Sequence, residues 1–205
     1  GLSSAREMSD GKVCVEDGTT SHLNLEDFFR ANNVDSTFVL VENDAEAQQK
    51  YLDGDCDAYS SDASSLAAAR ATFATPGDHV LLPEIISKEP LGPLVRQDDS
   101  QWADVVRWTL NALIAAEELG ITSANIEELA GGTDTPEINR ILGTEESFGE
   151  ALGLDAAWAK RAIMAGGNYG ELFEKNVGEA TPIGLPRGLN AQWTEGGLLY
   201  TPPFR

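Results

Sequence analysis

The sequence is poor in positive charge, and lysine is especially scarce. Its 205 residues include 14 Lys and Arg against 34 Asp and Glu, a formal net charge of -20 at pH 7. A surface of this sign repels nucleic acid and anionic lipid, so we expect neither as a partner. A well-solvated acidic surface explains the charge more simply than an adaptation to salt.

Cysteine, histidine and long apolar segments are also scarce. Cys14 and Cys56 lie far apart, and neither forms a metal-ligand spacing with His22 or His79, so we expect no transition-metal site. The longest apolar-rich segment, residues 108–121, includes an asparagine and two glutamates and is shorter than the roughly 20 apolar residues of a membrane span.

The first 90 residues alternate between strand-like and helix-like patterns. Lys12–Glu16 alternates apolar and polar side chains, and residues 37–41 (ThrPheValLeuVal) are nearly all apolar, which predicts two strands. The full predicted order is strand 12–16, helix 21–32, strand 37–41, helix 44–52, strand 56–60, helix 64–72 and strand 78–82. Strands that alternate with helices across short turns predict an α/β lobe with a parallel sheet.

From residue 101 onward the pattern predicts helices only. The longest, over residues 102–119, has its apolar side chains on one face. Shorter helices are expected near 124–130, 135–142, 155–165 and 168–177, with a crossing strand at 94–96 and an irregular end over 181–205. These helices have apolar faces but no sheet of their own to cover.

Small hydroxyl residues follow the first predicted strand where the helix begins. They are Thr19, Thr20 and Ser21. Parallel sheets bind ligands beyond the carboxyl ends of their strands, and a 2-1-3 strand order would bring this turn beside Asp62, which follows the third strand. Free N–H groups at a helix N-terminus favour a carboxylate, and Asp62 suits an ammonium group. Such a pair would suit a free α-amino acid.

The same residues also have a purely structural interpretation, which their spacing alone favours. Thr20 and Ser21 would cap their helix, and Asp62 would cap the next one. A nucleophilic enzyme fits poorly, because His22 lies next to Ser21 and adjacent helical residues do not face each other. The glycines at 131–132 and 166–167 lack the preceding strand and the lysine of a phosphate-binding loop.

Five strings spread along the chain resemble one protein family. They are ValCysValGluAspGlyThrThr from residue 13, GlyAspCysAspAlaTyrSerSerAsp from 54, SerLysGluProLeuGlyProLeuValArgGln from 87, GlyAsnTyrGlyGluLeuPheGluLysAsnValGly from 167, and ArgGlyLeuAsnAlaGlnTrpThrGluGlyGlyLeuLeuTyr from 187. Together they resemble the general L-amino-acid-binding proteins of bacterial ABC transporters. These are periplasmic solute-binding proteins with two lobes of the type 2 periplasmic-binding fold.

The resemblance implies a fold and a division of the chain. Residues 1–92 would form one complete βαβαβ ligand-binding lobe. Residues 93–205 would supply a crossing strand and the mainly helical segment of a second, incomplete lobe. Members of this family carry a further N-terminal region that builds most of that second lobe and supplies an arginine for the ligand carboxylate. We therefore expect this chain to be truncated relative to them.

The resemblance also implies a site. Thr19, Thr20 and Ser21 would hold the α-carboxylate of a free L-amino acid, and Asp62 would hold its α-ammonium group. Cys14 and Cys56 would form a disulfide, which suits an oxidising periplasm. No cofactor and no metal are implied.

The function implied is that of the binding component of an amino-acid importer, without catalysis, whose other partner is the membrane permease. We expect weak or lost binding, because one lobe cannot surround a zwitterion. We also expect the apolar faces of residues 102–119 and of the later helices to find a partner, which would be a second copy, a swapped element or a lost N-terminal fragment. The alternatives are an enzyme of the cyclohexadienyl dehydratase kind, with Asp62 as its acid or base, and a sensor or interaction domain.

Overall fold

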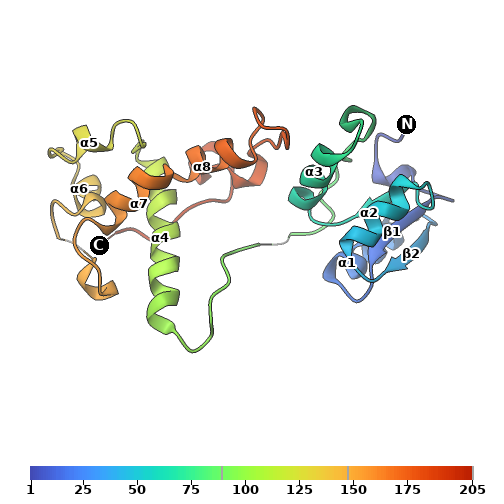
Figure 1. Cartoon of the computed structure of the whole chain (residues 1–205), viewed down its shortest axis with the longest axis horizontal. Coiled ribbons are helices and arrows are strands. Elements are labelled where there is room, and N and C mark those ends of the chain that lie inside the picture. Colours follow the sequence, from blue (N-terminus) through green and yellow to red (C-terminus); the bar gives the residue numbers. More distant parts are fainter. Residues whose placement is uncertain (89, 147, 205) are drawn as a thin grey trace. The chain divides into compact units, whose positions relative to one another are not determined.

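The computed structural model describes residues 1–88, 90–146 and 148–204. The chain divides into two compact units, Gly1–Leu91 and Gly92–Arg205 (Figure 1). The interpretation of residues 1–92 as one lobe, and of 93–205 as a segment of another, stays a prediction.

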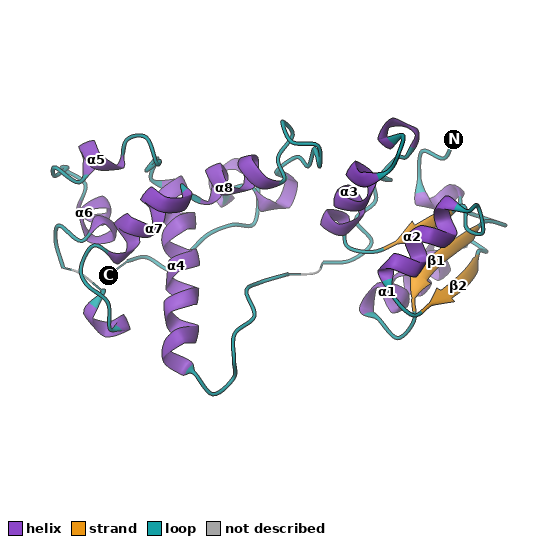
Figure 2. Cartoon of the chain, viewed as in Figure 1, coloured by secondary structure: helices purple, strands orange, loops and turns teal. Residues whose placement is uncertain are grey.

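The first unit is built around a short parallel sheet with β1 in the middle. β1 (Lys12–Glu16) pairs with β2 (Thr37–Val41) on one side and with β3 (Ala58–Ser60) on the other, so the order is β2-β1-β3 (Figure 2). Cys14 and Val15 have no exposed surface, as expected of a strand with a neighbour on each edge and cover on both faces. The predicted parallel sheet and its 2-1-3 order are confirmed.

Helices cover both faces of β1 because successive side chains of a strand point to opposite faces. The helices of this unit are α1 (Thr20–Asn32), α2 (Asp44–Leu52) and α3 (Ala63–Thr72). Val13 and Val15 form one core cluster with Phe29 of α1. Cys14 points the other way and clusters with Ala47 of α2. This two-sided burial fixes the positions of the turns at the ends of the strands.

Two predicted strands are wrong. Residues 78–82 do not form a strand: Pro76–Asp78 is a 3-10 turn, and irregular backbone follows it. Residues 94–96 are also irregular, and Leu94 is 97% exposed. A strand needs a neighbour for its backbone hydrogen bonds, and a short apolar pattern does not specify one.

The second unit is helical, as predicted. Its helices are α4 (Ser100–Glu118), α5 (Ile126–Leu129), α6 (Pro136–Leu142), α7 (Trp158–Gly166) and α8 (Tyr169–Asn176). Among the described residues of this unit, strand-like pairing is limited to two isolated bridges, Gly178 with Leu185 and Gln192 with Leu199. Ala116, Ile163 and Phe204 belong to one buried cluster. The end of the chain thus contributes to the same core as α4 and α7.

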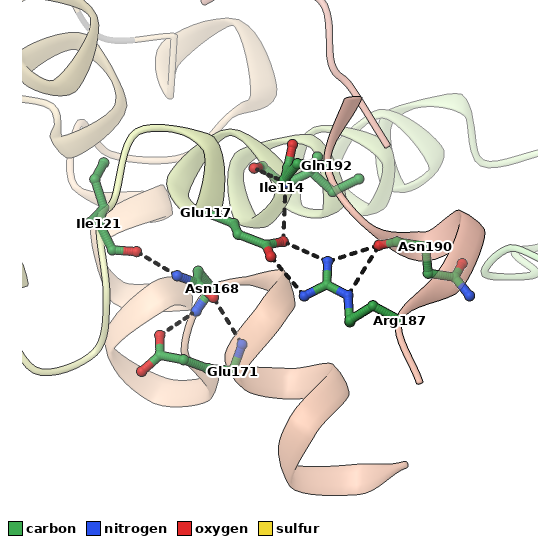
Figure 3. Close-up of polar contacts among 8 residues, drawn as sticks. All are labelled: Ile114, Glu117, Ile121, Asn168, Glu171, Arg187, Asn190 and Gln192. Atoms are coloured by element: carbon green, nitrogen blue, oxygen red, sulfur yellow. Dashed lines mark hydrogen bonds and ion pairs between the residues drawn. The ribbon is translucent and has the colours of Figure 1, made fainter. Parts of the chain in front are cut away.

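Polar contacts attach the irregular C-terminal segment to α4 (Figure 3). Arg187 donates to both carboxylate oxygens of Glu117, at 2.7 and 3.1 Å. The buried side chain of Gln192 donates to the carbonyl of Ile114 at 3.1 Å and to Glu117 at 3.0 Å. Glu117 therefore accepts hydrogen bonds from two separate points of this segment.

Candidate functional site

The Thr19 side chain fixes the conformation of the turn after β1. Gly18 has φ +71, a conformation that favours glycine, and Thr19 follows as the N-cap of α1. The Thr19 hydroxyl donates to the carbonyl of Glu16 at 2.8 Å and accepts from the backbone N–H of His22 at 3.2 Å. One side chain thus links the last residue of β1 to the first turn of α1.

The capping interpretation of Thr20 and Ser21 is wrong, because Thr19 does the capping. Both residues lie inside the first turn of α1, with Thr20 exposed and Ser21 partly buried. Within the described part of the chain, the backbone N–H groups of Gly18, Thr19, Thr20 and Ser21 meet no hydrogen-bond acceptor, and neither do the hydroxyls of Thr20 and Ser21. Consecutive free N–H groups at a helix N-terminus are a suitable receptor for an anion.

Asp62 occupies the corresponding position after β3. It is the N-cap residue of α3, yet its carboxylate makes no capping hydrogen bond. No hydrogen bond or ion pair joins this carboxylate to any other residue that the structure describes. The predicted structural role of Asp62 as a side-chain cap is therefore wrong, and its charge is available to a ligand.

The sheet brings the two turns to one edge. β1 and β3 run parallel with Val15 opposite Ser60, so the residues that follow each strand leave the sheet in the same direction. The chain thus carries free N–H donors after the central strand and a free carboxylate after its neighbour. An α-amino acid presents a matching carboxylate and ammonium group.

Acidic residues line the remaining part of this edge, which sequence analysis did not single out. A wide cavity of about 750 Å³ beyond β1 and β2 is lined by Asp17, Leu40, Val41, Glu42 and Glu46. The ring of His22 lies between two carboxylates, with Nδ1 3.6 Å from Asp17 and Nε2 3.3 Å from Glu26. The sequence could have indicated this acidic edge, because an acidic residue ends or closely follows each strand.

The disulfide implied by the resemblance is present and supports this edge of the sheet. Cys14 and Cys56 are bonded, with their Cα atoms 5.8 Å apart, and both are buried. The bond attaches the middle of β1 to the segment just before β3. It therefore restrains the spacing of the two strands whose ends carry the candidate site.

Nothing described in the structure points to a metal or a membrane span. The described His, Cys, Asp and Glu residues form no group of three able to hold a metal ion. Among the same residues, no helix is both long and apolar enough to cross a bilayer.

The chain is similar over its whole length to curated amino-acid-binding proteins. It is 59% identical to the glutamate/glutamine/aspartate/asparagine-binding protein BztA of Rhodobacter capsulatus, and spans 61% of that protein. It is 49% identical to the general L-amino acid-binding periplasmic protein AapJ of Rhizobium johnstonii, of which it spans 60%. The chain thus corresponds to about three fifths of these relatives. No protein-family model matches it.

A solved structure has the same fold. It is an ABC transporter periplasmic binding protein from Brucella ovis with glutathione bound, 52% identical in sequence, with a TM-score of 0.91. The match covers all of this chain and 64% of the other. The resemblance seen in the sequence is confirmed: the chain is a homologue of the periplasmic binding proteins of amino-acid ABC transporters and has the periplasmic-binding-protein fold.

Proposed function

We propose that this chain belongs to the amino-acid-binding component of a bacterial ABC importer and acts in the periplasm without catalysis. The free backbone N–H groups of Thr20 and Ser21, with Thr19 in the same turn, would receive the ligand's α-carboxylate. The free carboxylate of Asp62 would receive its α-ammonium group. The observation that carries this proposal is that the N–H donors and the carboxylate occupy one edge of the sheet, and that no residue described in the structure uses them in a hydrogen bond.

The relatives support the class of ligand. One is named as binding glutamate, glutamine, aspartate and asparagine, another as binding general L-amino acids, and the solved structure holds glutathione. Glutathione carries a free α-ammonium and α-carboxylate on its γ-glutamyl residue, so one head group is common to all these ligands. The turn after β1 and Asp62 would recognise that head group.

In this function the protein would bind and release its ligand without changing it chemically. A dehydratase would need an acid or base held over the reacting atoms, and Asp62 would be occupied by the ammonium group in the proposed arrangement. The membrane partner would be the permease of the importer, and closure of two lobes around the ligand would signal the loaded state to it. A sensor derived from a binding protein would use the same site but a different partner.

The proposal is tested by titrating the ¹⁵N-labelled chain with L-glutamine and following its amide resonances. Glutamine is chosen because its neutral side chain is not repelled by a chain of net charge -20. We expect shifts at Gly18, Thr20 and Ser21 and after Asp62, with an affinity weaker than micromolar. An affinity of micromolar or tighter would contradict the expectation that one lobe binds weakly.

The role of Asp62 is tested by Asp62→Asn with Asp78→Asn as the matched control. Asp78 is exposed in a 3-10 turn, so its substitution changes the net charge equally. We expect Asp62→Asn to weaken glutamine binding by about tenfold or more, the value of one charge-assisted hydrogen bond. Glutaramate, which lacks the α-ammonium group, should bind wild type and Asp62→Asn alike. Equal glutamine binding by the two aspartate variants would refute the assignment.

A further inference from the structure

Thr19 differs from its two neighbours in how its hydroxyl is used. The hydroxyls of Thr20 and Ser21 meet no hydrogen-bond partner among residues 1–88, 90–146 and 148–204, whereas the Thr19 hydroxyl both donates and accepts. Its hydrogen goes to the carbonyl of Glu16 at 2.8 Å, and its oxygen accepts the N–H of His22 at 3.2 Å. The family resemblance assigns one ligand-binding role to Thr19, Thr20 and Ser21, but their hydrogen bonds indicate that Thr19 has a different role.

The two hydrogen bonds of Thr19 determine which donors remain for a ligand. The cap takes the N–H of His22, the third residue of α1, and leaves the first two N–H groups of the helix without an acceptor in the part of the chain that the structure describes. The bond to Glu16 fastens the start of α1 to the end of β1, the central strand of the sheet. Without this side chain, the first turn of α1 would fray, and the N–H groups of Thr20 and Ser21 would lose their common direction.

We infer that Thr19 is a positioning residue, whose hydroxyl holds the N–H groups of Thr20 and Ser21 in the arrangement that receives the ligand carboxylate and does not itself contact the ligand. The inference rests on the proposed function and refines it. The turn is pre-organised by a bond to the central strand, so the ligand does not bear the cost of ordering it.

The test compares Thr19→Val with Thr19→Ser in the same titration with L-glutamine. Valine has the shape of threonine but no hydroxyl, whereas serine keeps both hydrogen bonds. We expect Thr19→Val to weaken binding about 5- to 10-fold and Thr19→Ser to retain most of the affinity. In the ligand-free protein, hydrogen exchange of the His22 amide should become faster in Thr19→Val and stay protected in Thr19→Ser.

Ser36→Ala is the control for the loss of a hydroxyl hydrogen bond elsewhere in the same unit. The Ser36 hydroxyl donates to the carbonyl of Met8, and Ser36 lies just before β2, at the end of the sheet opposite the candidate turn. The variant should lower stability and leave glutamine binding unchanged. Equal weakening of binding by Ser36→Ala and Thr19→Val would assign the effect to general destabilisation and overturn the inference.

The remaining outcomes separate the two proposals. Wild-type binding together with unchanged binding by Thr19→Val would overturn the role of Thr19 and leave the proposed function standing. Absence of any shift at Thr20 and Ser21 in the wild type, at tens of millimolar glutamine, would overturn the proposed function and the inference with it. Unchanged exchange of His22 in Thr19→Val would show that the hydroxyl does not hold the turn.

Discussion

The guanidinium of Arg187 and the carboxylate of Glu117 form a bidentate ion pair between residues 70 positions apart in the sequence (Figure 3). Their side chains are only 19% and 16% exposed. Arg187 also lies 5.5 Å from the ring centre of Tyr169 and 5.2 Å from that of Phe173. This pair attaches the C-terminal segment to α4 from within a partly buried environment.

Arg187→Met should therefore destabilise the second unit by about 2–4 kcal/mol, because it leaves the Glu117 carboxylate without its charge partner. All four tryptophans, Trp102, Trp108, Trp158 and Trp193, lie in this unit, so urea unfolding followed by tryptophan fluorescence measures it. The matched control is Arg161→Met, whose ion pair with Asp155 is 58% and 61% exposed and should therefore contribute much less to stability. Similar losses in both variants would contradict the partly buried role of Arg187.

The Cys14–Cys56 disulfide should contribute about 4 kcal/mol to the first unit, since it closes a loop with a sequence separation of 42 residues. Cys14→Ala/Cys56→Ala should lose this amount, measured by hydrogen exchange of the β1 amides. Reducing agent should accelerate exchange in the wild type and have no effect on the double variant. Detection of two alkylatable thiols in the unreduced protein would disprove the disulfide.

Asn168 combines a helix cap with a buried tertiary hydrogen bond. Its Oδ1 accepts the N–H of Glu171 at 2.9 Å, and its Nδ2 donates to the carbonyl of Ile121 at 2.8 Å. Burial alone would raise the pKa of Glu171, but hydrogen bonds from Ser123 and Asn168 outweigh it and lower that pKa. The neutral cap Asn168 therefore pairs with a Glu171 carboxylate whose charged form these hydrogen bonds favour.

Asn168→Ala should cost about 2–3 kcal/mol, as the sum of a lost cap and an unsatisfied buried carbonyl. Asn168→Ser should retain the cap and recover about 1 kcal/mol of this loss. Tryptophan fluorescence during urea unfolding again reports the second unit. If serine recovers nothing, the cap contributes little and the bond to Ile121 accounts for the whole effect.

Tyr59 should make the first unit less stable at alkaline pH. Burial, with the charge of Asp44 and the neighbouring Tyr51, raises the pKa of Tyr59 to about 12, and its hydroxyl finds no hydrogen-bond partner among the described residues. The unfolded chain releases this proton near pH 10, whereas the folded chain retains it, so folding stability is complete below about pH 10 and falls as the pH rises toward 12.

We expect a loss of about 1–2 kcal/mol between pH 9 and pH 11, measured by urea unfolding monitored by far-UV circular dichroism. Tyr59→Phe should reduce this loss and leave stability at pH 7 unchanged or slightly higher, because it removes an unpaired buried hydroxyl. Tyr200→Phe, at a side chain 72% exposed in the second unit, is the matched control and should not alter the pH dependence.

Much of the local structure followed from patterns within a few residues. The strands at 12–16 and 37–41 and the helix at 44–52 form over the predicted residues. The predicted strands at 78–82 and 94–96 failed, because only a partner in space turns an apolar run into a strand. Alternation and caps are local properties, whereas strand pairing is not.

The candidate site likewise depends partly on local sequence patterns and partly on contacts that only the tertiary structure shows. The run of hydroxyls and the later aspartate were visible in the sequence, and so was the expectation that a 2-1-3 order would bring them to one edge. The sequence could not show that Thr19 caps α1, nor that the side chains of Thr20, Ser21 and Asp62 make no hydrogen bond to any other residue described in the structure. That outcome depends on backbone angles and on distances to Glu16 and His22.

The sequence by itself determined the alternation of elements, the acidic surface and the family resemblance, because these depend on composition and on neighbours along the chain. Only the tertiary structure decided which polar groups satisfy one another. Glu117 meets Arg187 and Gln192 at separations of 70 and 75 residues, and no periodicity encodes such a contact. Hydrogen bonds act over about 3 Å, so their partners are settled only when the packed elements have taken their places.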